Sequence, residues 1–130
     1  MREKIIAGNF YHVLSRGVDK RTIFMENKDY LRFIHDLFEF NDINPVLNIN
    51  YLFNKKHSIE ASSQGVKRAP RKLLVEILAF CLMPNHFHLM IRPKQDGALT
   101  QFMKKLNIGY AKYFNEKYQR SGALFEGRFK

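Results

Sequence analysis

The stretch His86-Phe87-His88-Leu89-Met90-Ile91-Arg92 decides the fold, because its apolar and polar residues alternate strictly. Successive side chains of a β-strand point to opposite faces of a sheet, so this alternation predicts a strand. We expect helices to cover Phe87, Leu89 and Ile91. The other side chains would share a more open face of the sheet, namely His86, His88, Met90 and Arg92.

Three neighbouring segments also have the composition of strands. Leu73–Leu82 is almost entirely apolar, which predicts a central strand, and Met83-Pro84-Asn85 then forms a turn. Phe10–Ser15 is rich in β-forming residues, and Ala123–Phe129 follows a glycine, so we expect a first and a last strand there.

Two helices are predicted between these strands. Apolar residues recur at helical spacing from Lys28 to Phe40, and Asn27 is a suitable N-cap. A second helix is predicted over roughly 98–118, with Asp96 as its cap. Its apolar stripe consists of Leu99, Phe102, Met103, Leu106, Tyr110, Tyr113 and Phe114. The order β-α-β-β-α-β predicts an α+β fold, a ferredoxin-like antiparallel sheet with both helices on one face, formed by residues 1–130 as a single domain.

Between the first helix and the long apolar strand, residues 41–72 have the composition of a long loop. Pro45 and Pro70 interrupt this segment, which is rich in polar and basic side chains. A functional loop near a phosphate backbone and a mobile linker both fit.

The charge of the chain points to a polyanionic partner. There are 22 Lys and Arg against 12 Asp and Glu, a net charge of +10 in 130 residues. This excess favours nucleic acid over a small neutral metabolite, although a basic protein without such a partner would show it too.

No apolar run is long enough for a membrane span, and no secretory signal is recognisable. Cys81, the one cysteine, is expected to be buried, and we expect a cytoplasmic protein.

His86 and His88 form a candidate metal site. Two histidines two residues apart on a strand stand about 6–7 Å apart at the backbone, so their imidazoles can converge on one divalent ion. Two ligands are too few for a complete site, and two solvent-facing histidines in a basic sheet would have the same spacing.

The segment Met83-Pro84-Asn85-His86-Phe87-His88-Leu89 resembles the His-hydrophobic-His signature of the HUH endonucleases. The resemblance is to the single-tyrosine transposases of insertion sequences and their REP-associated relatives. It extends over nearly the full chain, through Tyr11-His12-Val13, Ser15-Arg16-Gly17, Arg21-Thr22-Ile23-Phe24, Tyr113-Phe114-Asn115 and 120–129.

This resemblance implies cleavage and rejoining of single-stranded DNA. A tyrosine hydroxyl would attack a DNA phosphate and form a 5′-phosphotyrosine linkage, which the freed 3′-OH can later reverse. Mg²⁺ or Mn²⁺, held by His86 and His88, would polarise the scissile phosphate. Single-stranded or hairpin DNA and a second copy of the chain are the implied partners.

The nucleophile of such relatives lies on a further helix, with Asn or Gln four residues later as a third metal ligand. We therefore expect it beyond Lys130. None of the six tyrosines here has Asn or Gln at that distance. Tyr113 and Tyr110 are the fallback candidates, although their place on the apolar stripe favours core packing.

Basic side chains would contact DNA phosphates collectively, and the affinity would then depend strongly on salt. The candidates are Arg16, Lys20, Arg21, Arg92, Lys104, Lys105, Lys112 and Arg128. Two rival interpretations stay open. A non-catalytic module that binds single-stranded DNA or RNA would place aromatic residues on the open face, and a phosphoesterase would need a second histidine motif, for which His12 looks isolated.

Overall fold

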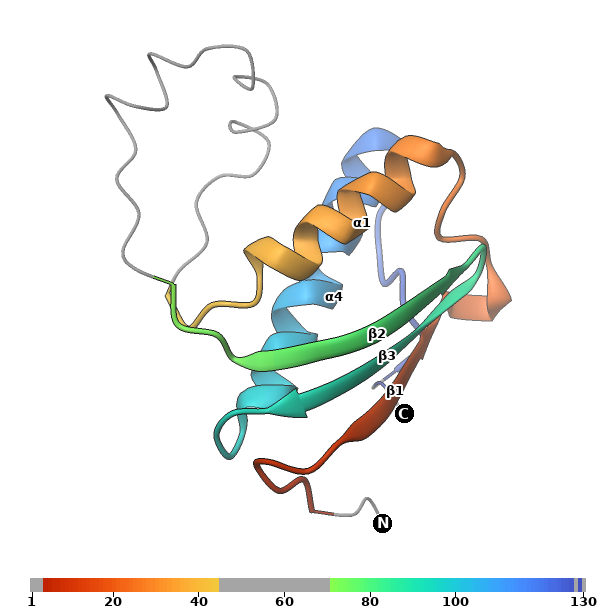
Figure 1. Cartoon of the computed structure of the whole chain (residues 1–130). Coiled ribbons are helices and arrows are strands. Elements are labelled where there is room, and N and C mark those ends of the chain that lie inside the picture. Colours follow the sequence, from red (N-terminus) through yellow and green to blue (C-terminus); the bar gives the residue numbers. More distant parts are fainter. Residues whose placement is uncertain (1–3, 45–70, 128, 130) are drawn as a thin grey trace, which may run out of the picture.

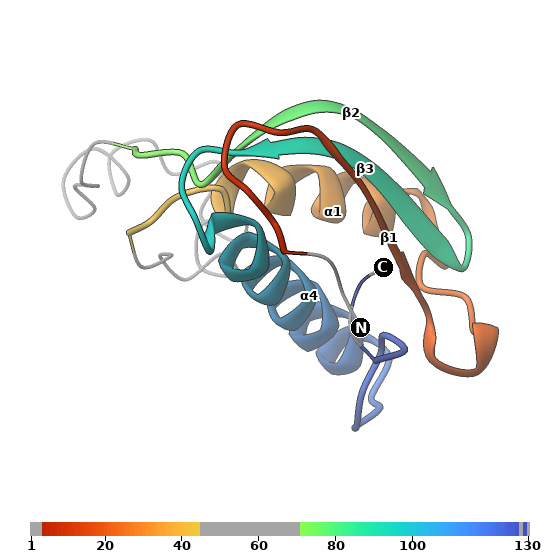
Figure 2. The same ribbon diagram turned by 90° about the horizontal axis from the view of Figure 1, so that it is seen from below.

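The computed structural model describes residues 4–44, 71–127 and 129. Its elements follow the order β1 (Tyr11–Arg16), η1 (Val18–Lys20), α1 (Asn27–Glu39), β2 (Val75–Met83), β3 (His86–Pro93) and α4 (Ala98–Lys117). The sheet arches over α1 and α4, which both lie on one of its faces, and no described helix covers the other, open face (Figures 1 and 2). The α+β class and the placement of both helices agree with the sequence-based prediction.

The three strands pair in the order β1-β3-β2, and both pairings are antiparallel. β3 is therefore the central strand, and the prediction of a central strand over Leu73–Leu82 is wrong. β2 forms an edge, with a register shift between Ile77 and Ala79, and it leaves Leu78 and Phe80 exposed. Its uniformly apolar sequence suggested burial on both faces, but no strand in the described residues pairs with its outer edge.

The predicted last strand over Ala123–Phe129 is also wrong as far as this segment is described. It forms a single bridge, between Gly17 and Phe125, flanked by hydrogen bonds from Val18 N to Leu124 O and from Glu126 N to Arg16 O, both 2.8 Å. Gly122 and Gly127 have positive φ angles of 89° and 53°, which turn the chain away from an extended course. The ferredoxin-like order therefore lacks its fourth strand in the described part of the chain.

The core lies between the sheet and the two helices. Phe33 of α1, Phe87 of β3 and Tyr110 of α4 are fully buried. The ring of Phe33 packs against the rings of both Phe87 and Tyr110. All of the predicted apolar stripe on α4 is buried except Tyr113, which is half-buried. The helix begins at Ala98 with Gly97 as its N-cap, one residue after the predicted Asp96.

The inward face of α1 is more polar than its sequence suggested. Asp29 and Asp36 are fully buried, whereas Leu31, Ile34 and Phe38, which are among the apolar residues that recur at helical spacing, are exposed. Asn27 is the first helical residue, and Glu26 takes the N-cap position without a side-chain hydrogen bond. The prediction of Asn27 as N-cap is therefore off by one residue. The loop predicted over 41–72 falls mostly outside the described residues.

Candidate metal and nucleic-acid site

The open face of the sheet carries the candidate site. Phe87, Leu89 and Ile91 of β3 are fully buried on the helix side, so the predicted alternation along this strand is confirmed. His86 and His88, which point the other way, are half-buried. On the neighbouring strand β1, Arg16 pairs with His86 and Leu14 pairs with His88.

The turn before β3 fixes the ring of His86. Asn85 Oδ1 lies 2.7 Å from His86 Nδ1, and an amide oxygen only accepts hydrogen bonds, so Nδ1 of His86 is the donor. The amide nitrogen of Asn85 donates to the carbonyl oxygen of Lys20 at 3.4 Å, which supports this orientation of the amide. When His86 is neutral, its Nε2 therefore presents a lone pair.

His12 of β1 contacts His88, so the sequence-based view of His12 as isolated is wrong. Its Nε2 lies 2.8 Å from Nδ1 of His88, and the two ring planes differ by only 5°. The centroids of the two parallel rings are 4.9 Å apart. Only the register between β1 and β3 brings these residues together, and the spacing within either segment does not reveal it.

The two histidines of β3 have a geometry that suits a shared ion. Their ring centroids are 4.9 Å apart and their planes are inclined at 81°. An ion bound about 2.1 Å from two imidazole nitrogens would hold the ring centroids on the order of 5 Å apart. Burial, and then the neighbouring His86 and His12, lower the pKa of His88, which favours the neutral form that a metal ion requires.

These donors fit a divalent ion that accepts imidazole, but they do not complete its coordination. Within the described ranges, no three His, Cys, Asp or Glu side chains are arranged to hold a metal ion together. Cys81 lies opposite His88 on β2 and is exposed, so the expectation that it is buried is wrong. Cys81 is exposed because it lies on the open face of the edge strand β2, and no other described element covers that face.

Helix α4 holds the tyrosines that were considered as fallback nucleophiles, and it lies on the opposite face of the sheet (Figure 2). Tyr110 is fully buried, and its hydroxyl donates to the carbonyl oxygen of Ile23 at 2.5 Å. Tyr113 donates to the buried carboxylate of Asp29 at 2.6 Å. Burial and then this hydrogen bond raise the pKa of Tyr113 to about 12. Neither hydroxyl faces the histidines.

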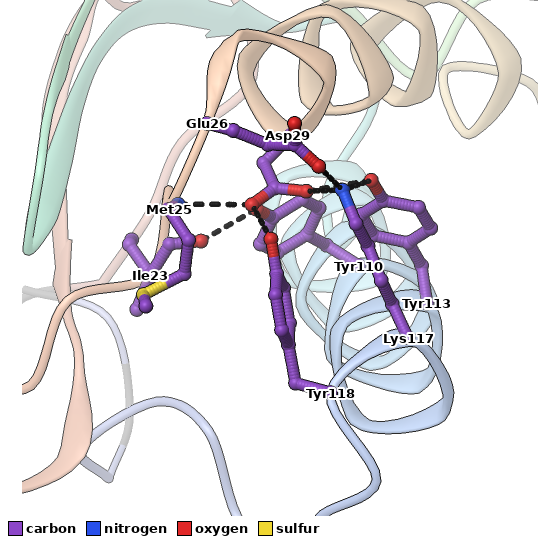
Figure 3. Close-up of polar contacts among 8 residues, drawn as sticks. All are labelled: Ile23, Met25, Glu26, Asp29, Tyr110, Tyr113, Lys117 and Tyr118. Atoms are coloured by element: carbon purple, nitrogen blue, oxygen red, sulfur yellow. Dashed lines mark hydrogen bonds and ion pairs between the residues drawn. The ribbon is translucent and has the colours of Figure 1, made fainter.

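Asp29 is the centre of the polar network to which Tyr113 belongs (Figure 3). Its carboxylate also accepts hydrogen bonds from Lys117 Nζ at 2.7 Å and from the Tyr118 hydroxyl at 2.6 Å. Glu26 forms a second ion pair with Lys117. These contacts tie α1 to the last turn of α4, so they explain the positions of Tyr113 and Tyr118 by packing and charge pairing.

The basic candidates do not form one patch. Arg16 ends β1, Lys20 ends η1 and Arg21 follows it, and this segment contacts the turn that carries Asn85. Lys104 and Lys112 are exposed on α4, in the helix layer. Arg128 lies outside the described residues.

Three of these basic side chains have intramolecular partners. Arg92 forms a two-pronged ion pair with Glu76, at 2.8 Å and 3.2 Å. Lys105 Nζ donates to the carbonyl oxygens of Asp42 and Asn44. Arg21 lies over the ring of Phe114, 5.0 Å from its centroid. These contacts give each side chain a structural role besides any contact with a nucleic acid.

The open face bears on the rival interpretation of a base-stacking module. The side chains that β3 and its neighbours direct to this face include His12, Leu14, Cys81, Met83 and Met90. None of these is Phe or Tyr, on which RNA-binding modules stack bases, although the exposed ring of Phe10, just before β1, lies against Arg92 of this face. In the described part of the chain, no helix has the length and apolar character needed to cross a membrane.

Comparison with known proteins identifies the family. No curated protein matches the chain. The family model described as "Transposase IS200 like" matches residues 46–130, which is more than half of the chain. The matched region includes β2, the turn at Asn85, both histidines of β3 and the whole of α4. The chain therefore belongs to the IS200-like transposase family.

Proposed function

We propose that this chain carries the DNA-binding and ion-binding part of a transposase that cuts and rejoins single-stranded DNA through a phosphotyrosine intermediate. The observation that carries the proposal is the pair His86 and His88 on the open face, with ring centroids 4.9 Å apart. Family membership supports a role in transposition. Within the described strands, no Phe or Tyr points to the open face, and Phe10, just before β1, lies against Arg92; a base-stacking module is therefore the weaker candidate.

His86 and His88 would hold a divalent ion, and Mn²⁺ suits imidazole ligands better than Mg²⁺, which prefers oxygen ligands. The ion, when bound, would polarise a scissile phosphate and stabilise charge on its oxygens. The protein side chains orient the DNA around it. Arg16 pairs with His86, and Lys20 of η1 accepts a hydrogen bond from Asn85 at its carbonyl oxygen, so both would bind the phosphates that flank the cleavage point.

The nucleophilic tyrosine of this reaction would lie beyond Lys130. The hydroxyls of Tyr110, Tyr113 and Tyr118 are all engaged in hydrogen bonds within the helix layer. A nucleophile must reach the phosphate at the histidines, on the other face of the sheet. A tyrosine on a further segment, with a polar residue one helical turn later as third ligand, would meet both needs.

A homodimer is the assembly that we propose from the resemblance. The edge strand β2 is nine residues long and exposes Leu78 and Phe80. An unpaired, apolar edge of this kind favours association with another strand. Light scattering after size-exclusion chromatography tests this: a monomer at all concentrations up to about 100 µM would contradict it, since that limit corresponds to a free energy near −5.5 kcal/mol.

The central experiment is a search for the covalent adduct. A chain extended by its native downstream sequence is incubated with labelled single-stranded or hairpin DNA and Mn²⁺, and a denaturing gel detects labelled protein. We expect an adduct with the extended chain, and none with its His88→Ala variant or with residues 1–130 alone. An adduct with residues 1–130 would show that the nucleophile lies within them, and its loss in Tyr113→Phe or Tyr110→Phe would identify it.

A further inference from the structure

Each histidine of the site is held at its Nδ1 atom by a different neighbour. Asn85 accepts a hydrogen bond from Nδ1 of His86 at 2.7 Å, and Nε2 of His12 lies 2.8 Å from Nδ1 of His88. The two contacts come from different parts of the fold, one from the β2–β3 turn and one from β1. In both rings, Nε2 is the nitrogen that is left for another partner.

The contact at His86 has only one possible direction. An amide oxygen has lone pairs but no proton, so the proton must be on Nδ1 of His86. A neutral imidazole carries a single N–H, and Nε2 of His86 is then a free lone pair. Free histidine in water prefers the proton on Nε2, so Asn85 holds His86 in the less common tautomer.

The contact at His88 becomes directional once an ion is bound. An ion on Nε2 of His88 leaves the single ring proton on Nδ1, which then donates to Nε2 of His12. The two ring planes are parallel to within 5°, and this hydrogen bond would fix the rotation of the His88 ring. The remaining proton of neutral His12 is then on its Nδ1.

We propose that Asn85 and His12 are positioning residues that direct Nε2 of His86 and Nε2 of His88 toward one divalent ion. This inference rests on the proposed function, because it concerns the ion of that same site. Hydrogen bonds from a ligating histidine to a second residue fix its ring and its tautomer, and their removal typically weakens metal binding. The side chain of His12 is exposed, so a role in folding does not account for its alignment with His88.

The first experiment needs no metal ion. Two-dimensional NMR of the ¹⁵N-labelled histidine rings reports which nitrogen carries the proton. We expect His86 with its proton on Nδ1 in the wild-type chain and in Asn85→Asp, which keeps the accepting oxygen, and a shift toward Nε2–H in Asn85→Leu. A wild-type His86 with its proton on Nε2 would overturn the role of Asn85.

The second experiment measures Mn²⁺ binding by electron paramagnetic resonance on the full 130-residue chain. His12→Phe should weaken binding by about 10-fold or more, the usual effect of losing such a partner. His12→Gln should restore most of the affinity, because its amide oxygen can accept near the place of Nε2. Met90→Leu is the matched control, since Met90 stands opposite His12 on the same face, and it should leave binding unchanged.

The outcomes separate this inference from the proposed function. Mn²⁺ binding that His12→Phe leaves unchanged would overturn the role of His12 alone. No saturable binding by the wild-type chain would overturn both the positioning role and the ion site. Binding that depends on His12, together with an extended chain that forms no DNA adduct, would support the positioning role and overturn the proposed strand cleavage.

Discussion

Gly109 of α4 lies directly against the ring of Phe40, the C-cap residue of α1, and no side chain fits between them. A Cβ atom at Gly109 would overlap Cζ and Cε2 of that ring. Glycine is used here for the close approach of two helices, since its backbone is helical and needs no unusual φ angle. The two helices contact each other over the core, so this position sets their spacing.

Gly109→Ala should therefore lower the free energy of unfolding. Alanine favours a helix over glycine by about 1 kcal/mol, but overlap in a packed core costs typically 1–3 kcal/mol. We expect a net loss of about 1 kcal/mol in urea unfolding, since the overlap involves an aromatic ring. In a Phe40→Leu background the same substitution should cost less. A more stable Gly109→Ala chain would show that the ring moves aside freely.

Asp29→Asn tests the network that joins the two helices. Asp29 accepts hydrogen bonds from Lys117, Tyr113 and Tyr118 while fully buried. Removing one partner of a buried ion pair costs about 3–5 kcal/mol. The control is Glu26→Gln, because Glu26 also pairs with Lys117 but its side chain is 50% exposed, and such exposed pairs contribute about 0–1 kcal/mol. Equal losses in the two variants would contradict the central role of Asp29.

The pH dependence of the same network has a definite sign. Burial alone would raise the pKa of Asp29, but the hydrogen bonds from Lys117, Tyr113 and Tyr118 lower it below its ordinary value. A lowered pKa in the folded state stabilises the fold above the unfolded value, near 3.9, and the gain is lost as the pH falls through the folded pKa. The stability difference between wild type and Asp29→Asn should therefore shrink below pH 4.

Asp36 should have the opposite effect. Burial raises its pKa to about 7, against the opposing charge of Arg32, and its Oδ2 has no hydrogen-bond partner among the described residues. The folded state then holds a proton that the unfolded state releases, so stability is lost as the pH rises from about 4 to about 7. Asp36→Asn should gain relative to wild type over this window, by on the order of a few kcal/mol at about 1.4 kcal/mol per pKa unit. Urea unfolding at several pH values measures the gain, and a difference independent of pH would contradict it.

The sequence-based predictions succeeded where the pattern of neighbouring residues in one segment determines the structure. The alternation in β3, the turn before it and the apolar stripe of α4 each depend on neighbouring residues, and all three are present in the structure. Strand pairing is not local. The apolar run in β2 suggested a central strand, although its position at the edge depends on β1 pairing with β3 instead.

The candidate site was predictable only where its residues lie close together in the sequence. His86 and His88 stand out by their spacing within one strand, whereas His12 joins them from a strand 74 positions earlier than His86. The acids of α1 were assigned no role from the sequence. Asp29 is buried because its partners, Tyr113, Lys117 and Tyr118, come from the other end of the sequence. No periodicity within α1 reveals those partners.

The position of the DNA can be tested by two charge-matched double variants. Arg16→Gln with Lys20→Gln removes one charge opposite His86 and one in η1, and Lys104→Gln with Lys112→Gln removes two exposed charges from the helix layer. If DNA phosphates cross the open face at the histidines, the first pair should weaken binding to a labelled single strand more than the second. Fluorescence anisotropy over a range of salt concentrations measures both effects.

The salt dependence gives this comparison its quantitative form. Each phosphate contact to a single strand adds about −0.7 to the slope of log affinity against log salt, so losing two contacts should flatten the slope by about 1.4. The variant with Lys104 and Lys112 neutralised should keep a slope near that of the wild type, since both variants change the net charge equally. Equal slopes for the two variants would show that overall charge attracts the DNA. A flatter slope for the helix variant alone would place the DNA on α4, away from the histidines.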